Sequence, residues 1–382
     1  MQGCRRETGS DFCAPPPVPG GFVLPGALRR IARSARRSDY ILLQGERMNT
    51  AGSGTGRIVV MGASSGGLAA LRAVLPYFPN ELDAPVLVVM HIGKHSSVLP
   101  ELLAPYSSLP VAHAGHDATL RGGQIFVAPP DRHMMVEGGR IRLTSGPKEN
   151  FTRPAIDPLF RSAAVEFGAR AVAVVLTGHL DDGAAGAVAI HACGGTVIVQ
   201  DPADCVAPSM PLSTLRAVPM SRVTHLGKVG DAIVKAVQTP VKGGGMKKTD
   251  KQRFEIETRI GLTGVSTPAD LDRIGERTTL TCPECGGVVW QVGSDAPLRF
   301  RCHTGHAFSS ETLDGAQRSE LEDAIWTGVR KAVECAALAR DKAERAAAQG
   351  DNASADEARQ EHARLETLGE TLRALALQAA TE

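Results

Sequence analysis

The sequence lacks any apolar run of 18 or more residues, so neither a membrane-spanning helix nor membrane insertion is expected. Its N-terminus also lacks the basic, apolar and small-residue order of a secretory signal. Neither sign of charge is in excess, because 42 Lys and Arg face 41 Asp and Glu over 382 residues. This balance argues against nucleic acid or a charged membrane surface as a partner.

Cysteines are few and mostly scattered along the chain. Of the eight, only Cys282, Cys285 and Cys302 form a tight pattern. Scattered thiols argue against a disulfide scaffold and favour a reducing compartment, so we expect a cytoplasmic protein.

The first 52 residues differ in composition from the rest of the chain. A Pro/Gly stretch at 14–21 and an Arg-rich stretch at 29–37 predict a disordered tail. Two alternatives remain open, namely translation starting at Met48 and a basic arm that binds a partner. The remaining chain is expected to divide into an α/β domain at 53–238, a linker at 239–277, a cysteine-bearing module at 278–309 and a helical hairpin at 310–382.

Five short β-branched runs alternate with helical stretches in the α/β segment. They lie at 58–61, 86–90, 125–128, 171–176 and 196–199. Continuous Val/Ile runs indicate strands that are buried on both faces, and the helical stretches between them indicate parallel crossover connections. The predicted fold class is therefore α/β, with a doubly wound and mostly parallel sheet.

Ser64 lies in the segment Gly62–Gly67, between the first strand and a helix. The segment fits Gly-x-Ser-x-Gly, in which a sharp turn lifts a nucleophilic serine above the sheet edge. Free N–H groups at the helix N-terminus are suited to stabilise an oxyanion. The alternative is a phosphate-binding loop, but Ser64 replaces the second glycine of the dinucleotide pattern and no Gly-Lys-Ser/Thr follows.

A serine nucleophile needs a base, and the base needs an orienting group. His91 directly follows the second buried run, and Asp182 follows the fourth. Both are therefore expected at the carboxyl edge of the sheet, where open α/β folds bind ligands. The alternatives are a structural histidine and an aspartate that caps the next helix. The chain order Ser, His, Asp disfavours the α/β-hydrolase superfamily, whose order is Ser, Asp, His.

Residues 58–237 resemble the catalytic domain of the CheB family of chemotaxis methylesterases. The likeness rests on blocks in the same order: Gly62–Gly67, His91, 125–134, Arg153-Pro154 with Asp157, 175–178, 182–186, Cys205 and Met210-Pro211. The resemblance implies that Ser64 is the nucleophile, His91 the general base and acid, and Asp182 the orienting carboxylate, with no cofactor for catalysis. The implied reaction is hydrolysis of glutamate methyl esters on methylated chemoreceptors, often with deamidation of receptor glutamines.

Arg153 has two candidate roles, binding an acidic receptor segment or pairing with Asp157.

Two features depart from the family pattern. Members usually carry Met-Gly where this chain has His179-Leu180, close to the reaction centre. In the same segment, Asp181 beside Asp182 leaves two carboxylates as candidates to face His91. The well-known members carry an N-terminal phospho-acceptor receiver domain, whose acidic pair and strand series are missing here. We therefore expect a receiver-less relative that is controlled by other means.

Four side chains near the C-terminus have the spacing of a zinc site: Cys282, Cys285, Cys302 and His306. A Cys-x2-Cys knuckle followed by Cys-x3-His supplies ligands for tetrahedral Zn²⁺. His306 is preferred to His303, because an adjacent Cys-His pair is poorly spaced to share one metal. Runs at 288–290 and 298–300 predict the strands of a structural, zinc-ribbon-like module. A reduced mini-domain without metal is the alternative.

Two hypotheses of different classes follow. In the first, the chain is an active serine-type protein-glutamate methylesterase. In the second, it is a non-catalytic signalling adaptor that uses the esterase-like fold and the helical hairpin to hold partners, and His179-Leu180 marks lost chemistry. A generic small-molecule esterase is a third, weaker option.

Overall fold

The computed structural model describes residues 56–93, 95–241, 248–293 and 297–379. The tail predicted over residues 1–52 lies outside these ranges. The chain divides into the units Met1–Gly52 and Ser53–Glu382, and all described residues belong to the second. None of the described helices combines the length and apolar character needed to cross a membrane.

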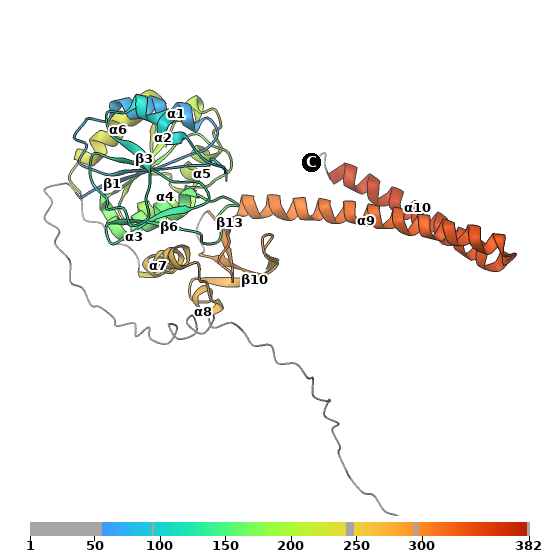
Figure 1. Ribbon diagram of the computed structural model, residues 1–382. Coiled ribbons are helices and arrows are strands. Elements are labelled where there is room, and N and C mark those ends of the chain that lie inside the picture. The colour runs from blue at the N-terminus through green and yellow to red at the C-terminus, as the bar shows by residue number, and fades with distance from the viewer. Residues whose placement is uncertain (1–55, 94, 242–247, 294–296, 380–382) are drawn as a thin grey trace, which may run out of the picture. The chain divides into compact units, whose positions relative to one another are not determined.

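Seven parallel strands form the central sheet (Figure 1). In spatial order they are β3 (Val111–His113), β4 (Ile125–Val127), β2 (Val86–Met90), β1 (Ile58–Ala63), β7 (Ala171–Val175), β8 (Thr196–Gln200) and β9 (Arg222–Thr224). The order runs outward from β1 in both directions, so the predicted doubly wound α/β class is confirmed. The edge strands β3 and β9 escaped prediction, because each is short and partly exposed.

Helices cover both faces of this sheet (Figure 1). One face carries α1 (Gly67–Val74), α2 (Leu99–Leu103) and α6 (Leu226–Gln238). The other carries α3 (Ile156–Phe167), α4 (Ala184–Ala192), α5 (Ser209–Ala217) and the antiparallel hairpin of β5 (His133–Glu137) and β6 (Arg140–Thr144). Single 3-10 turns lie at Leu75–Tyr77, Ala104–Tyr106, Gly168–Arg170 and Pro202–Asp204. Side chains alternate between the two layers, as Val59 and Val60 do, which explains why the strands are apolar throughout.

The segment expected to be a linker contains two helices, α7 (Lys248–Thr263) and α8 (Pro268–Leu271). Phe254 of α7 is buried in the core layer formed by α3 and α4. The structure therefore differs from the expected linker, because α7 hides its apolar side against the α/β domain. The three glycines that suggested a linker, at 243–245, precede this helix in the sequence.

A four-stranded antiparallel sheet follows, with the order β10 (Gly275–Thr281), β11 (Val288–Val292), β12 (Arg299–Cys302) and β13 (Ala307–Ser309). The strands predicted for the ribbon correspond to β11 and β12. We call residues 275–313, this sheet with the first turn of the next helix, the C-terminal module.

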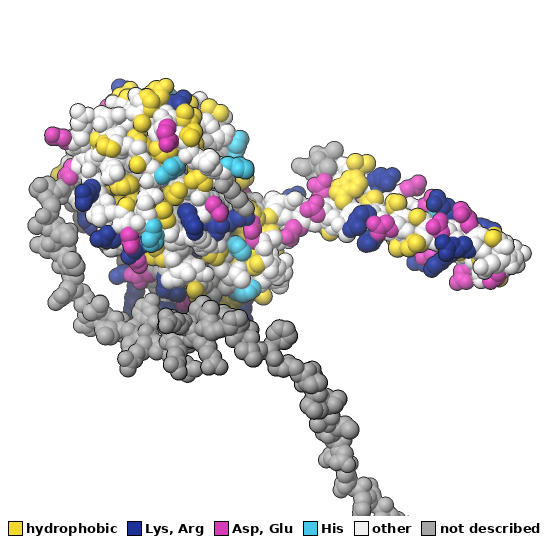
Figure 2. All heavy atoms as spheres, in the orientation of Figure 1, with side chains coloured by type: hydrophobic (Ala, Val, Ile, Leu, Met, Phe, Trp, Pro, Cys, Tyr) yellow, Lys and Arg dark blue, Asp and Glu magenta, His cyan; other side chains and the backbone are white. Residues whose placement is uncertain are grey.

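Two long helices, α9 (Ser310–Ala348) and α10 (Asn352–Ala379), complete the described chain as an antiparallel hairpin. The buried side of α9 is mostly alanine, which lets the two helix backbones approach closely: Val329, Ala332, Ala336, Ala339 and Ala343. Figure 2 shows Lys and Arg intermixed with Asp and Glu along the hairpin surface. Pairs one turn apart, such as Arg330 and Glu334, account for this mixing.

Candidate active site

Three polar side chains meet at the carboxyl edge of the central sheet. Ser64 directly follows β1, His91 directly follows β2, and Asp182 lies in the loop after β7. Because β1 pairs in parallel with both β2 and β7, these three strand ends are neighbours in space. The structure thus brings together all three residues predicted as a catalytic set.

The imidazole of His91 connects the other two side chains. Its Nδ1 lies 3.1 Å from Ser64 Oγ, and its Nε2 lies 2.8 Å from Asp182 Oδ2. The His91 side chain is 18% exposed and that of Asp182 only 3%. With the ring proton on Nε2 donated to the carboxylate, the lone pair of Nδ1 faces the serine hydroxyl. The three groups are therefore spaced as a nucleophile, a base and an orienting carboxylate would need to be.

The turn that carries Ser64 depends on two glycines. Gly66 has φ +77°, a conformation that few other residues adopt, and it begins α1. A Cβ on Gly178 would lie 2.8 Å from the Ser64 Cβ, so only glycine permits this approach. Among the hydrogen bonds of the described residues, the N–H groups of Ser65 and Gly66 have no protein acceptor. They are therefore available beside the serine.

The Asp182 carboxylate is buried and held by several donors. Besides His91, its Oδ2 accepts from Ile156 N (2.7 Å). Its Oδ1 accepts from Asp157 N (3.1 Å) and from Asn150 Nδ2 (3.2 Å). Burial by itself raises the pKa of Asp182, but the hydrogen bonds from His91 and the backbone outweigh it, so the pKa lies below its usual value. Asp182 is therefore ionised at neutral pH.

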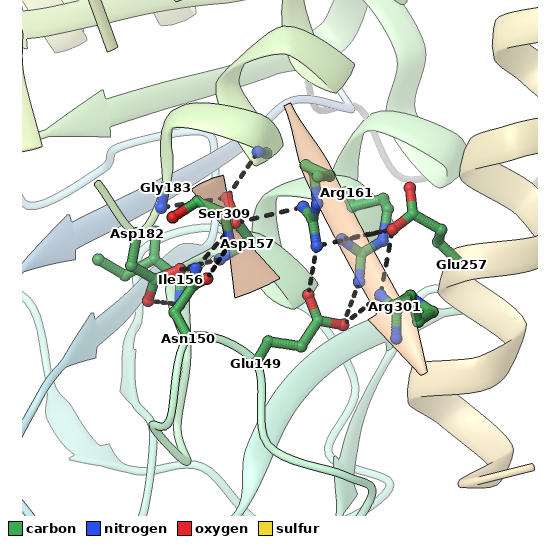
Figure 3. A network of polar contacts seen from close by, with 12 residues as sticks. Glu149, Asn150, Ile156, Asp157, Arg161, Asp182, Gly183, Glu257, Arg301 and Ser309 are labelled. Carbon is green, nitrogen blue, oxygen red and sulfur yellow. Dashed lines mark hydrogen bonds and ion pairs between the residues drawn. The ribbon is translucent and has the colours of Figure 1, made fainter. Parts of the chain in front are cut away.

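A second buried carboxylate, Asp157, lies next to Asp182 (Figure 3). Its Oδ1 accepts from Gly183 N (3.0 Å) and Gly186 N (2.6 Å), and its Oδ2 lies 3.3 Å from Arg299 Nη1. Burial raises the pKa of Asp157 to about 6, although Arg299 acts in the opposite direction. Through its hydrogen bonds to Gly183 N and Gly186 N, Asp157 holds the start of α4 in place.

A buried ion cluster joins the C-terminal module to the α/β domain, and Figure 3 labels Glu149, Arg161, Glu257 and Arg301 in it. Arg299 also belongs to this cluster. Glu149 lies at its centre, 2.6 Å from Arg161, 2.8 Å from Arg301 and 3.1 Å from Arg299. Glu257 of α7 lies 3.1 Å from Arg301. Burial opposes ionisation, yet the three guanidinium groups hold the pKa of Glu149 well below its usual value.

Arg153 does not pair with Asp157, which was one of the two roles considered for it from the sequence. It pairs with Asp131 (2.9 Å) and donates to the carbonyl oxygens of Ser145 and Gly146. The cation beside Asp157 is Arg299 instead, which comes from 142 residues further along the chain. The predicted ion pair between Arg153 and Asp157 was therefore wrong.

His179-Leu180, the segment that departs from the family pattern, has a left-handed residue in its backbone. Leu180 has φ +62°, the left-handed conformation that glycine adopts without strain, and its side chain is 56% exposed. His179 is also exposed. Asp182 contacts His91, whereas Asp181 faces Ser309 and Glu311 at the N-terminus of α9.

Sequence reasoning missed Arg299 and did not single out Asn150. Arg299 and Arg301 are two positions apart and so share one face of β12. That alternation was a usable signal of a charged strand face, but nothing local indicated that this face would be buried. For Asn150 the sequence carried no signal of its role.

A separate cluster in the C-terminal module has the donors of a metal site: Cys282, Cys285, Cys302 and His306. Their ligand atoms all lie within 4.8 Å of one another. The Sγ atoms of Cys285 and Cys302 are 3.7 Å apart, and Cys302 Sγ lies 3.6 Å from His306 Nδ1. Tetrahedral zinc, with Zn–S of about 2.3 Å and Zn–N of about 2.0–2.1 Å, gives edges of roughly 3.8 and 3.6 Å. A hydrogen bond from Cys282 and one from His306 lower the pKa of Cys302. The residues present therefore fit such an ion.

The fold and the hydrogen-bonded Ser–His–Asp arrangement define a site of the serine hydrolase type. Residues 59–233 match the family model described as CheB methylesterase. A putative protein-glutamate methylesterase/protein-glutamine glutaminase from Leptospira interrogans is 31% identical over 182 residues, which are 47% of this chain and 94% of that protein. The chain belongs to the CheB methylesterase family, as the sequence resemblance predicted.

Two further relatives show how the match is distributed. Protein-glutamate methylesterase/protein-glutamine glutaminase 2 from Methanosarcina mazei is 37% identical over 190 residues, 47% of this chain and 52% of that protein. The crystal structure of the Thermotoga maritima CheB methylesterase catalytic domain is 32% identical and covers 48% of this chain and 99% of that one, with a TM-score of 0.46. The matched share in each case is about half of this chain.

Leu180→Gly should raise the free energy of unfolding by about 1 kcal/mol, because glycine relieves the left-handed strain at an exposed position. Urea denaturation of the two proteins measures the difference. Leu212→Gly, at an exposed position inside α5, is the matched control and should lower stability by about 1 kcal/mol. Destabilisation by both variants would contradict the strain at Leu180.

Burial, together with Asp157 and Glu311, raises the pKa of Asp181 to about 7, against a hydrogen bond from Ser309. In the unfolded chain an aspartate titrates at about 3.9. The folded state therefore binds this proton more tightly, and the resulting stability is complete below about pH 4 and is lost as the pH rises through about 7. Asp181→Asn should consequently gain stability over the wild type as the pH increases from 5 to 8, measured by urea unfolding at each pH. Asp231→Asn is the matched control, because Asp231 is an exposed aspartate on α6.

Proposed function

We propose that this chain is a protein-glutamate methylesterase that hydrolyses glutamate methyl esters on methylated chemoreceptors by a Ser64–His91–Asp182 mechanism. Membership of the CheB methylesterase family supports the reaction class. The single structural observation that carries the proposal is the continuous hydrogen-bonded chain from Ser64 Oγ through both ring nitrogens of His91 to the buried Asp182.

The geometry assigns each group a step in the reaction. Ser64 Oγ attacks the ester carbonyl while His91 Nδ1 takes its proton, and Asp182 stabilises the imidazolium that forms. The N–H groups of Ser65 and Gly66, at the N-terminus of α1, are placed to stabilise the oxyanion. His91 then returns the proton to the departing methoxide, which leaves as methanol, and water releases glutamate from the acyl-enzyme. Apart from the substrate and the hydrolytic water, these steps use side chains and backbone groups of this chain.

The same site also supports deamidation of receptor glutamines. A glutamine gives the same acyl-enzyme as the methyl ester, and only the group expelled when it forms differs, ammonia instead of methanol. The Leptospira and Methanosarcina relatives carry both activities in their names. We place this activity in the cytoplasm, where the thiols of the C-terminal module stay reduced.

Ser64→Ala should lower methanol release from methylated receptor by about a thousandfold or more, because the nucleophile is removed. Release is measured with the full chain and purified methylated receptor. Ser107→Ala is the matched control, because Ser107 precedes β3 and so lies away from the carboxyl edge. Equal release by wild type and Ser64→Ala would refute the mechanism. Folded wild-type protein that releases no methanol would favour the adaptor hypothesis or another substrate.

We further propose that Cys282, Cys285, Cys302 and His306 hold one structural Zn²⁺. The four donors form a closed set, which leaves no position for substrate and matches a structural role. Cys282 directly follows β10, Cys285 lies between β10 and β11, and Cys302 ends β12, so the ion would tie these strands together. A bound ion would supply folding free energy to a module that has a small apolar core.

Metal analysis of the purified full chain should find one zinc ion per molecule. Cys302→Ala should reduce this to near zero and lower the unfolding temperature, because one of four ligands is lost. Cys335→Ala is the control, since Cys335 is an exposed thiol on α9 and should leave the zinc content unchanged. Full zinc content in Cys302→Ala would overturn this assignment.

A further inference from the structure

One amide side chain bridges the triad carboxylate and the C-terminal module (Figure 3). The Nδ2 of Asn150 donates to Asp182 Oδ1 (3.2 Å) and to Asp157 Oδ2 (3.3 Å). The Oδ1 of Asn150 accepts from Ser309 N (3.1 Å) and from the Thr312 hydroxyl (3.3 Å). Ser309 and Thr312 form the capping box of α9, so the same groups that begin this helix also hold the amide.

The backbone around Asn150 is joined to the module as well. Asn150 N donates to Ala307 O (2.8 Å), and Ala307 N donates to Lys148 O (3.2 Å), so the loop extends the sheet beside β13. The ring of Phe151 packs 5.0 Å from that of Phe308. These contacts hold the loop against the C-terminal module.

Such support is needed because the loop is strained. Asn150 has φ +50° and Phe151 has φ +61°. The left-handed conformation is tolerable for Asn but unfavourable for Phe, and two such residues in succession persist only when their surroundings enforce the shape. In this structure the enforcing contacts come from β13 and the start of α9.

The module also contributes charge to the site. Arg299 of β12 lies 3.3 Å from Asp157 and 3.1 Å from Glu149. It thereby places a buried cation beside the adjacent carboxylates of Asp157 and Asp182. Two neighbouring buried carboxylates ionise together only with compensation of this kind.

We infer that the C-terminal module is a positioning element of the triad and that Asn150 is the residue through which it acts, an inference that rests on the proposed role of Ser64. The Asn150 amide stabilises the negative charge of Asp182 and fixes the rotation of its carboxylate. Because Oδ1 is held by Asn150 and by the backbone, Oδ2 is directed at His91. The helix cap of the module in turn fixes the amide.

Labelling of Ser64 by a fluorophosphonate probe tests this inference without requiring the receptor. Asn150→Ala in the full chain should slow labelling about tenfold, the value of one hydrogen bond to a charged group. Without that donor, the coupled His91–Asp182 pair takes up a proton more readily. In a plot of labelling rate against pH, the fall in rate on the acidic side should therefore move to higher pH by about half a unit to one unit. A merely structural role would lower the rate equally at every pH.

A matched pair of variants tests the contribution of the module. Thr312→Val removes the hydroxyl that holds Asn150, so labelling should slow about two- to threefold with a shift in the same direction. Thr312→Ser keeps the hydroxyl and should restore the wild-type profile. Gln317→Ala is the control on the same helix, because it removes only an exposed bond to Thr281 O (2.9 Å) and should change neither rate nor profile.

Each outcome is decisive. If the probe labels the wild type and Asn150→Ala keeps the wild-type pH profile, the inference is overturned and the esterase proposal stays intact. A wild type that is not labelled refutes the serine mechanism itself, and the inference with it. If Asn150→Ala does not fold, identical profiles for Thr312→Val and Thr312→Ser would overturn the inference, and different ones would support it.

Discussion

The buried carboxylate of Asp182 is the constraint on which the rest of the site depends. A buried charge is tolerated only when it is paired and hydrogen-bonded, and Asp182 meets this condition with donors from three parts of the chain. His91 follows β2, Ile156 and Asp157 begin α3, and Asn150 lies in the loop before α3. The position of the His91 ring therefore follows from the hydrogen bonds by which the fold stabilises the Asp182 carboxylate.

The helices α3 and α4 exchange N-terminal caps around Asp182: Asp182, just before α4, caps α3, and Asp157 of α3 caps α4. No side chain of its own caps the start of α3, and its free N–H groups at Ile156 and Asp157 donate to Asp182. Gly183 begins α4 without a side-chain cap, and Asp157 accepts from Gly183 N and Gly186 N. Helix N-termini favour negative charge, so this exchange stabilises both helices and both carboxylates. The hydrogen bonds that hold Asp182 and the packing of α3 on α4 are thus parts of one arrangement.

The C-terminal module adds a further layer to the same arrangement. Its attachment is ionic as well as apolar, since Arg299 and Arg301 insert between acidic groups of the α/β domain and α7. Taking such charges out of water costs much of what their attraction returns, so this cluster contributes little net stability. The cluster does fix the position of the module on the domain, because any shift of the module would leave a buried charge without a partner. The value of the cluster lies in fixing the register of β12 and β13 against Asn150.

Much of the chemistry was readable from sequence, because it depends on local pattern. Buried apolar runs predicted β1, β2 and β7, and residues that follow parallel strands gather at one edge, so Ser64, His91 and Asp182 were foreseeable as a set. The Cys and His spacing in the module was equally local. Only the tertiary structure decided which ring nitrogen of His91 faces Ser64, that Asp157 pairs with Arg299, and that α7 packs on the domain. Those contacts join residues that are distant along the chain, and the burial that gives them their strength has no signature in any local stretch of sequence.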